Sequence, residues 1–95
     1  MNDEQLNRKR SNARSIVAPR VGKIVQVTFR TGEGRKTRTD DFLISRVDET
    51  AVWLDEVSWD GVQQKLVPSG NPFAVDLKRI HFIMDGDQGM WPRKG

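Results

Sequence analysis

The sequence predicts an all-β protein, a small closed barrel of five strands that follows a basic N-terminal tail. Two patterns predict this fold class: short apolar segments whose side chains alternate between two faces, and turn residues between those segments. The chain has 95 residues, of which 36% are hydrophobic and 31% charged, which is typical of one domain with a modest core. We expect a tail over residues 1–20, a barrel over 21–84 and a flexible C-terminal tail over 85–95.

The N-terminal tail contains few large apolar side chains, so it cannot bury enough surface to fold alone. Asn2 or Asp3 is positioned to cap a short helix that reaches about Arg14, with Leu6 as its only strong apolar anchor. The sequence leaves open whether this tail is partly disordered or helical.

Four segments have the composition of strands, at residues 23–30, 40–47, 51–59 and 62–67. A long basic loop with two glycines, residues 31–37, joins the first two segments into a hairpin. Asp60 and Gly61 have the favoured composition of a two-residue turn, so the third segment is expected to fold back onto the fourth. Pro68 ends the returning strand, and a loop continues to Pro72.

A fifth strand begins at Phe73 and contains a change of phase. Alternation through Val75 and Leu77 resumes at Ile80 after a spacing of three residues instead of two. One turn of 3₁₀ helix over residues 77–80 explains this slip, because 3₁₀ side chains repeat every three residues.

The order of these elements between Val21 and Ile83 resembles the SH3-like and Sm-like group of small β-barrels. The likeness rests on strand order and on the spacing FxVxLxxIxF over residues 73–82. It implies a closed barrel and the binding of RNA, DNA or peptides. The Sm-type signature is missing, because residues 47–50 read VDET where that family has its base-reading polar residue. Ring assembly and uridine recognition are therefore not expected.

Charge is unevenly distributed along the chain, although the formal net charge is only +3. Residues 1–20 contain five cationic and two acidic side chains, whereas residues 47–61 contain five acids and no cation. The molecule should have a basic end and an acidic patch.

No catalytic residue, cofactor or metal is expected. The chain has no cysteine, which excludes disulfides and thiolate sites, and its single histidine, His81, cannot form a multi-histidine metal cluster. The segment around Asp85 and Asp87 lacks the later glutamate of a calcium loop, and residues 32–37 lack the spacing of a phosphate-binding loop. No apolar stretch approaches the roughly 18 residues needed to span a bilayer, so we expect a cytoplasmic protein.

Nucleic-acid binding, to RNA or DNA, is the function that the sequence favours. Cations in the tail and around the first loop can neutralise phosphates, and an exposed tryptophan can stack on unpaired bases. The candidate binding residues are Arg8, Lys9, Arg10, Arg14, Arg30, Arg35, Lys36, Arg38 and Trp59. Of the other tryptophans, Trp53 is expected in the core and Trp91 in the tail.

Two alternatives stay open. The chain is also suited to a protein-interaction role, as an adaptor, inhibitor or assembly factor that uses residues 48–60 or the Trp91 tail. A purely solubilising tail would account for the N-terminal arginines as well. The sequence does not indicate an oligomeric state.

Overall fold

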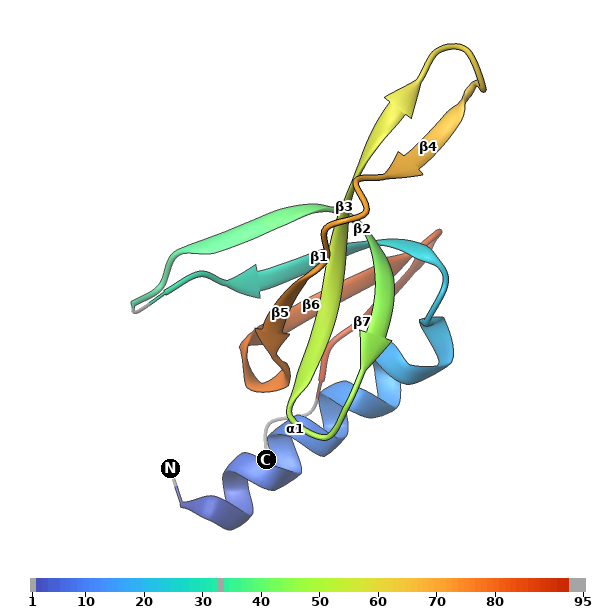
Figure 1. The fold of residues 1–95 in the computed structure, drawn as a ribbon. Helices are drawn as coiled ribbons and strands as arrows, with labels where there is room; N and C mark the ends of the chain where they lie inside the picture. Colours follow the sequence, from blue (N-terminus) through green and yellow to red (C-terminus); the bar gives the residue numbers. More distant parts are fainter. Residues whose placement is uncertain (1, 33, 93–95) are drawn as a thin grey trace.

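The computed structural model of the chain describes residues 2–32 and 34–92, which form an N-terminal helix and one antiparallel sheet (Figure 1). Two short 3₁₀ helices, η1 and η2, complete the fold. In chain order the elements are α1 (Asp3–Val17), η1 (Ala18–Arg20), β1 (Ile24–Arg30), β2 (Thr37–Val47), β3 (Ala51–Asp60), β4 (Lys65–Pro68), β5 (Phe73–Asp76), η2 (Leu77–Arg79), β6 (Ile80–Asp85) and β7 (Gln88–Met90). The protein is therefore α+β.

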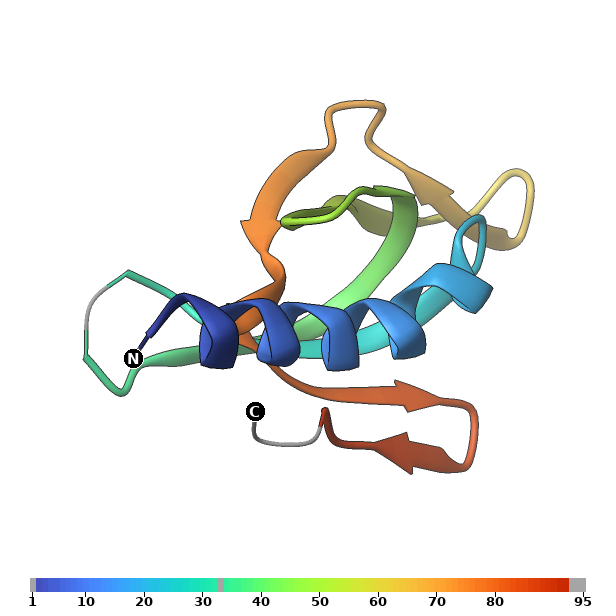
Figure 2. The same ribbon diagram turned by 90° about the horizontal axis from the view of Figure 1, so that it is seen from below.

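The expectation of an all-β, five-stranded closed barrel is wrong, because the seven-stranded sheet is open. Its strand order is β4-β3-β2-β1-β6-β7, and β5 pairs with the first half of β3. Strand β5 passes directly into η2, and in the described part of the chain no ladder joins β5 to β6 to close a barrel. The helix α1 packs mainly against η2, and Figure 2 shows it running across the end of the curved sheet.

The core lies between the sheet and α1. The alternation in β1 is confirmed, since Val25, Val27 and Phe29 are all buried. Phe29 packs with Phe42 and Phe73 in a group of three rings whose centroids lie 5.7 to 6.1 Å apart. Tilted and edge-on ring pairs of this kind stabilise a core beyond simple area burial.

The helix α1 is part of this core instead of a free tail. Asn2 caps it, because its Oδ1 accepts a hydrogen bond from the backbone N–H of Gln5 at 2.8 Å. The helix continues past Arg14 to Val17, and Ala13 and Val17 are completely buried while Ile16 packs against the core. Helical spacing puts these three side chains on one face, so the C-terminal half anchors the helix.

Both predicted hairpins form, but the second has a different turn. Strands β1 and β2 pair across the long loop, and β3 pairs with β4 from Val57 to Asp60. The turn between β3 and β4 spans residues 61–64 instead of two residues, because Asp60 Oδ1 accepts hydrogen bonds from the N–H groups of Val62 and Gln63. Gln64, and not Gly61, takes the positive φ.

The predicted 3₁₀ turn is confirmed at Leu77–Arg79. Residues 88–90, expected within the flexible C-terminal tail, instead form β7 against β6, whereas residues 93–95 of that tail lie outside the described residues. No helix among the described residues is long and apolar enough to cross a membrane.

Candidate functional site

The four cations predicted in the N-terminal tail project from α1 and have different surroundings. Arg8 pairs with Glu4 at 3.2 Å in a solvent-exposed i,i+4 contact. Arg10 donates two hydrogen bonds to Asp76, from Nε at 3.1 Å and from Nη2 at 2.7 Å. Lys9 lines a small pocket beside Trp91, and Arg14 lines another that includes Glu49. The helix thus spreads these side chains over several surfaces instead of gathering them on a mobile arm.

Arg10 has a structural role that the sequence did not reveal. The hydrogen bond to Asp76 raises the pKa of Arg10 above its ordinary value. Burial alone would raise the pKa of Asp76, but the hydrogen bonds from Arg10 and from the Lys78 backbone N–H outweigh it and lower that pKa. The pair therefore remains charged and holds α1 against η2.

Arg38 is also engaged by its neighbours. Its guanidinium lies 3.3 Å from Asp40 and 3.6 Å from Glu56, and it stands over the Phe42 ring at 5.0 Å. Two carboxylates already balance its charge, so Arg38 is a poor candidate for holding a phosphate.

A group of three cations stands out at the junction of β1, β5 and η2. Arg30 lies here beside Lys78 and Arg79, which the sequence reasoning did not select. The three line a pocket of about 350 Å³, which we call the cationic pocket. Among its described lining residues the one acid is Asp76, whose carboxylate Arg10 already occupies.

The cations of the cationic pocket form no close ion pair within the described residues, although the charge of Lys78 acts on Asp76. No described acid lies within ion-pair distance of Arg30, Lys78 or Arg79. The Nε of Arg30 is buried and has no hydrogen-bond partner. A buried donor left unpaired costs about 1–3 kcal/mol, and the Arg30 side chain must shift before an incoming anion can accept this hydrogen.

The sequence contained a signal that could have identified Lys78 and Arg79 as site residues. The phase slip located a helical turn at residues 77–80, and Lys78 and Arg79 belong to that turn. The sequence alone did not reveal that β1 pairs with β6. In this pairing Phe29 lies opposite Ile80. That register brings Arg30 to the end of η2.

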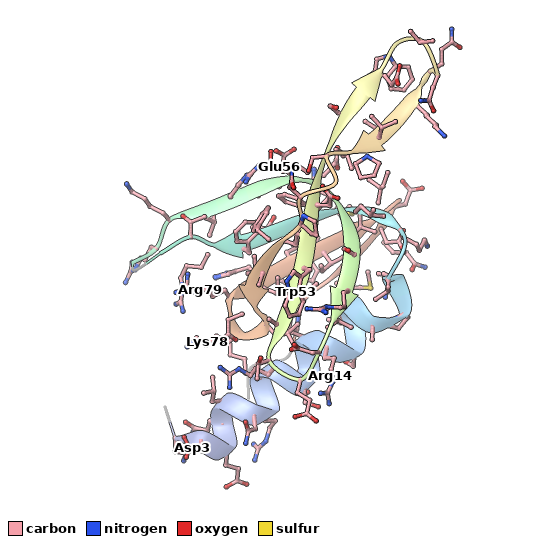
Figure 3. The ribbon with its side chains drawn as sticks, viewed as in Figure 1. Asp3, Arg14, Trp53, Glu56, Lys78 and Arg79 are labelled. Carbon is pink, nitrogen blue, oxygen red and sulfur yellow. The ribbon has the colours of Figure 1, made fainter. Side chains whose placement is uncertain are left out.

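Arg35 and Lys36 extend the positive surface. Both are exposed in the loop between β1 and β2. In Figure 3, Lys78 and Arg79 lie on the side of the sheet toward which this hairpin projects, whereas Arg14 lies on α1, away from both of them. Of the nine predicted binding residues, the structure thus brings Arg30 to the cationic pocket, with Arg35 and Lys36 in the neighbouring loop.

The three tryptophans are in separate places. Trp53 is half-buried beneath the guanidinium of Arg46, which lies 3.9 Å from its ring centroid. Trp59 is 65% exposed on the β3–β4 hairpin, which projects from the opposite end of the sheet to α1 (Figure 1). Trp91 is 70% exposed and lies against Phe82, with ring centroids 4.4 Å apart. Trp59 therefore does not share a surface with the cationic pocket.

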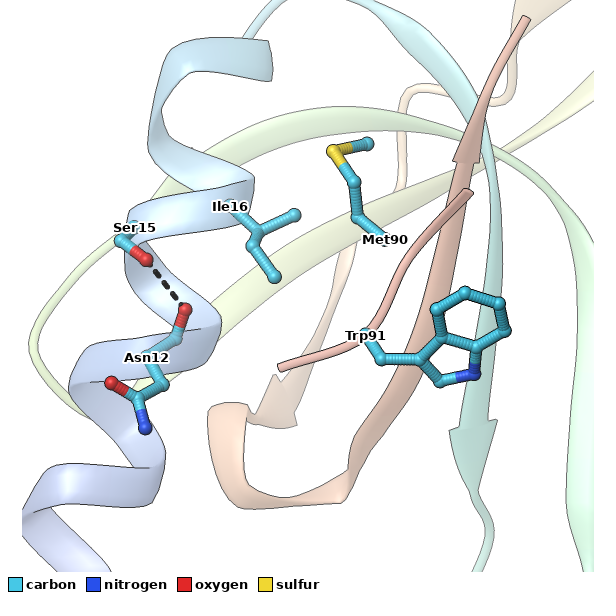
Figure 4. A pocket seen from close by; sticks show the side chains of 5 residues that line it. All are labelled: Asn12, Ser15, Ile16, Met90 and Trp91. Carbon is cyan, nitrogen blue, oxygen red and sulfur yellow. Dashed lines mark hydrogen bonds between the residues drawn. The ribbon is translucent and has the colours of Figure 1, made fainter. Parts of the chain in front are cut away.

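A larger pocket, of about 460 Å³, separates α1 from the end of β7. Its walls are formed by Asn12, Ser15, Ile16, Met90 and Trp91, and Ser15 Oγ donates a hydrogen bond to the Asn12 carbonyl at 2.7 Å (Figure 4). None of the described residues that line this pocket has a charged side chain. In residues 2–32 and 34–92, no group of three His, Asp or Glu side chains is placed to hold a metal ion.

No protein-family model, curated protein or solved structure matched the chain. Its own fold and site therefore define its class. It is a small α+β protein with an open antiparallel sheet and a pocket lined by three cations.

Proposed function

We propose that this protein is a non-enzymatic, cytoplasmic nucleic-acid-binding protein that holds a backbone phosphate in the cationic pocket. One observation carries the proposal: Arg30, Lys78 and Arg79 line the same pocket, and no described acid lies within ion-pair distance of any of them. A guanidinium is well shaped to hold a phosphate through more than one hydrogen bond.

The surroundings of the pocket favour a polymer over a single small anion. Arg35 and Lys36 add two exposed charges in the loop that follows Arg30. A chain of phosphates can engage several such cations at once and release counterions from each, which gives affinity without requiring base contacts. We therefore expect binding that weakens steeply as salt concentration rises.

Fluorescence anisotropy with labelled RNA and DNA oligonucleotides tests this function. A triple variant of Arg30→Gln, Lys78→Gln and Arg79→Gln removes the pocket cations. Its matched control carries Arg8→Gln, Arg14→Gln and Lys65→Gln, which removes the same charge outside the pocket. We expect the pocket variant to lose roughly 100-fold in affinity at low salt and to show a salt slope shallower by about 2–3, with a much smaller loss in the control.

Two results contradict the proposal. Equal losses in the two triple variants mean that overall charge, and not the cationic pocket, drives binding. Absence of binding to any oligonucleotide at low salt refutes the function altogether.

One observation favours a second candidate function, protein binding. Trp59, Val62 and Leu66 expose apolar side chains on the β3–β4 hairpin, and Val62 is 95% exposed. Aromatic residues exposed together with aliphatic ones are a common feature of protein-binding surfaces. A partner captured from nuclease-treated lysate, and lost when Trp59→Ala and Val62→Ser are introduced, would support this function; a partner that disappears on nuclease treatment favours the first.

A further inference from the structure

We infer that Trp91 is a stacking platform for an unpaired base, and that the ligand of this protein is single-stranded nucleic acid. The inference rests on the proposed function, because it assumes that a nucleic-acid backbone lies in the cationic pocket. It adds the form of the ligand, which the cations alone do not determine.

The indole of Trp91 is held in place on one side and open on the other. Strands β6 and β7 pair Ile83 with Met90, and the next step of this register sets Phe82 opposite Trp91. Their rings lie 4.4 Å apart at 37°, yet Trp91 remains 70% exposed. A ring that its neighbour already orders loses little conformational entropy when a base stacks on its outer face.

Gly89 makes this arrangement possible. A Cβ atom at Gly89 would lie only 2.6 Å from Cζ of Phe82, so a glycine is needed for the Phe82 ring to lie across β7. The ring that supports Trp91 is thus confined by the backbone of the neighbouring strand.

The platform and the cationic pocket lie on the same part of the molecule. Phe82 pairs with Thr28 of β1, and Arg30 follows two residues later in that strand, past the shift in register between Thr28 and Phe29. Along the chain, Arg79 lines the cationic pocket, while His81 lines the small pocket that Lys9 shares with Trp91. A nucleic-acid strand with a phosphate in the cationic pocket therefore has the exposed ring of Trp91 and the charge of Lys9 nearby.

Such a platform discriminates between nucleic-acid forms. Inside a duplex both faces of each base are covered by neighbouring pairs, so an indole on the protein surface has no base face to contact except at the two ends. In a single strand the bases are free to stack on aromatic side chains, whatever their identity. The preference we expect is thus for single strands over duplexes, without strong sequence specificity.

The test compares Trp91→Ala with the unmodified protein on three labelled probes: a thymidine or uridine oligonucleotide, an abasic oligonucleotide of the same length, and a blunt duplex. We expect Trp91→Ala to weaken binding of the base-containing single strand about 10-fold and to change binding of the other two less than about twofold. Trp59→Ala, which removes an indole of similar exposure from the β3–β4 hairpin, should leave all three unchanged. Trp91→Phe should restore most of the lost affinity.

Each other outcome overturns the inference. Equal losses on the base-containing and abasic strands mean that Trp91 supports the fold or contacts the backbone. No loss on any probe, with the pocket triple variant still defective, overturns the stacking role and leaves the proposed function standing. If the unmodified protein binds none of the probes, the proposed function fails and the inference fails with it.

Discussion

Arg10 on α1 and Asp76 at the start of η2 form a two-point ion pair, Nε to Oδ1 at 3.1 Å and Nη2 to Oδ2 at 2.7 Å. The same carboxylate caps η2, because its Oδ1 also accepts the backbone N–H of Lys78 at 3.0 Å. One side chain therefore attaches the helix to the sheet and orders the turn that carries two of the three pocket cations. Docking of α1 and the shape of the cationic pocket are coupled through Asp76.

Substitution of Asp76 should reduce the stability of the protein. Asp76→Asn weakens the charge-assisted hydrogen bonds to Arg10, and we expect the free energy of unfolding to fall by about 1–3 kcal/mol in urea titrations. Arg8→Gln is the control, because it breaks only the exposed pair with Glu4 and should cost less than about 0.5 kcal/mol. Equal stability of the two variants would show that the pair does not hold α1.

Stability should decrease in acid. The hydrogen bond from Lys23 lowers the pKa of Asp85, against an opposing effect of burial and with further help from the charge of Arg20, and the pKa of Asp76 is lowered as well. Both carboxylates bind protons more readily when the chain is unfolded, at a pKa of about 3.9, so their contribution is present above that pH. It is lost as the pH falls through the lower pKa values of the folded state.

We therefore expect the free energy of unfolding to be nearly constant from neutral pH to about pH 5 and to decline below it. Urea titrations over this range measure the decline. In Asp85→Asn the decline should be shallower, because this variant has already lost the titrating group. A decline of unchanged steepness in Asp85→Asn would exclude Asp85 as a source of the acid sensitivity.

Asp55 should be the most costly acid to remove. It is only 4% exposed, and its carboxylate accepts hydrogen bonds from the backbone N–H groups of Ser69 and Gly70 and from the Ser69 hydroxyl. Asp55→Ala leaves these donors unpaired beside a cavity, so we expect a loss of about 3 kcal/mol, measured by urea unfolding. Glu56→Ala, at the exposed neighbouring position, should lose less than about 1 kcal/mol; a similar loss in both would contradict the role of Asp55.

Sequence periodicity located β1, β2 and β3 because each of these strands contributes buried side chains to the core. The alternation at Val25, Val27 and Phe29 was sufficient for β1, and the spacing around Leu77 was sufficient for η2. The docking of α1 was missed because it depends on Ala13 and Val17, whose side chains give a weak apolar signal. Their packing partner η2 lies some sixty residues along the chain, where no local pattern reveals it.

The open sheet and the cationic pocket depend on pairings that the sequence does not encode locally. Strand β3 divides its outer edge, with residues 51–54 against β5 and 57–60 against β4. Sequence reasoning paired the third segment only with the fourth, and it took the closed barrel from the resemblance to SH3-like and Sm-like domains. Likewise, Arg30 and Arg79 line one pocket because β1 pairs with β6. The distribution of charge along the sequence instead indicated the N-terminal tail as the main binding surface.

Gly89→Ala should disturb the aromatic pair without unfolding the sheet. The added methyl would overlap the Phe82 ring, which must move and carry Trp91 with it, so we expect a loss of about 1 kcal/mol in urea and a changed tryptophan emission spectrum. Gly61→Ala is the matched control, because no atom lies within 4 Å of its added methyl and the position has no positive φ. It should change neither quantity by a comparable amount. If Gly89→Ala also leaves stability and emission unchanged, the Phe82 ring is not confined by β7, and Trp91 is not held in a fixed orientation.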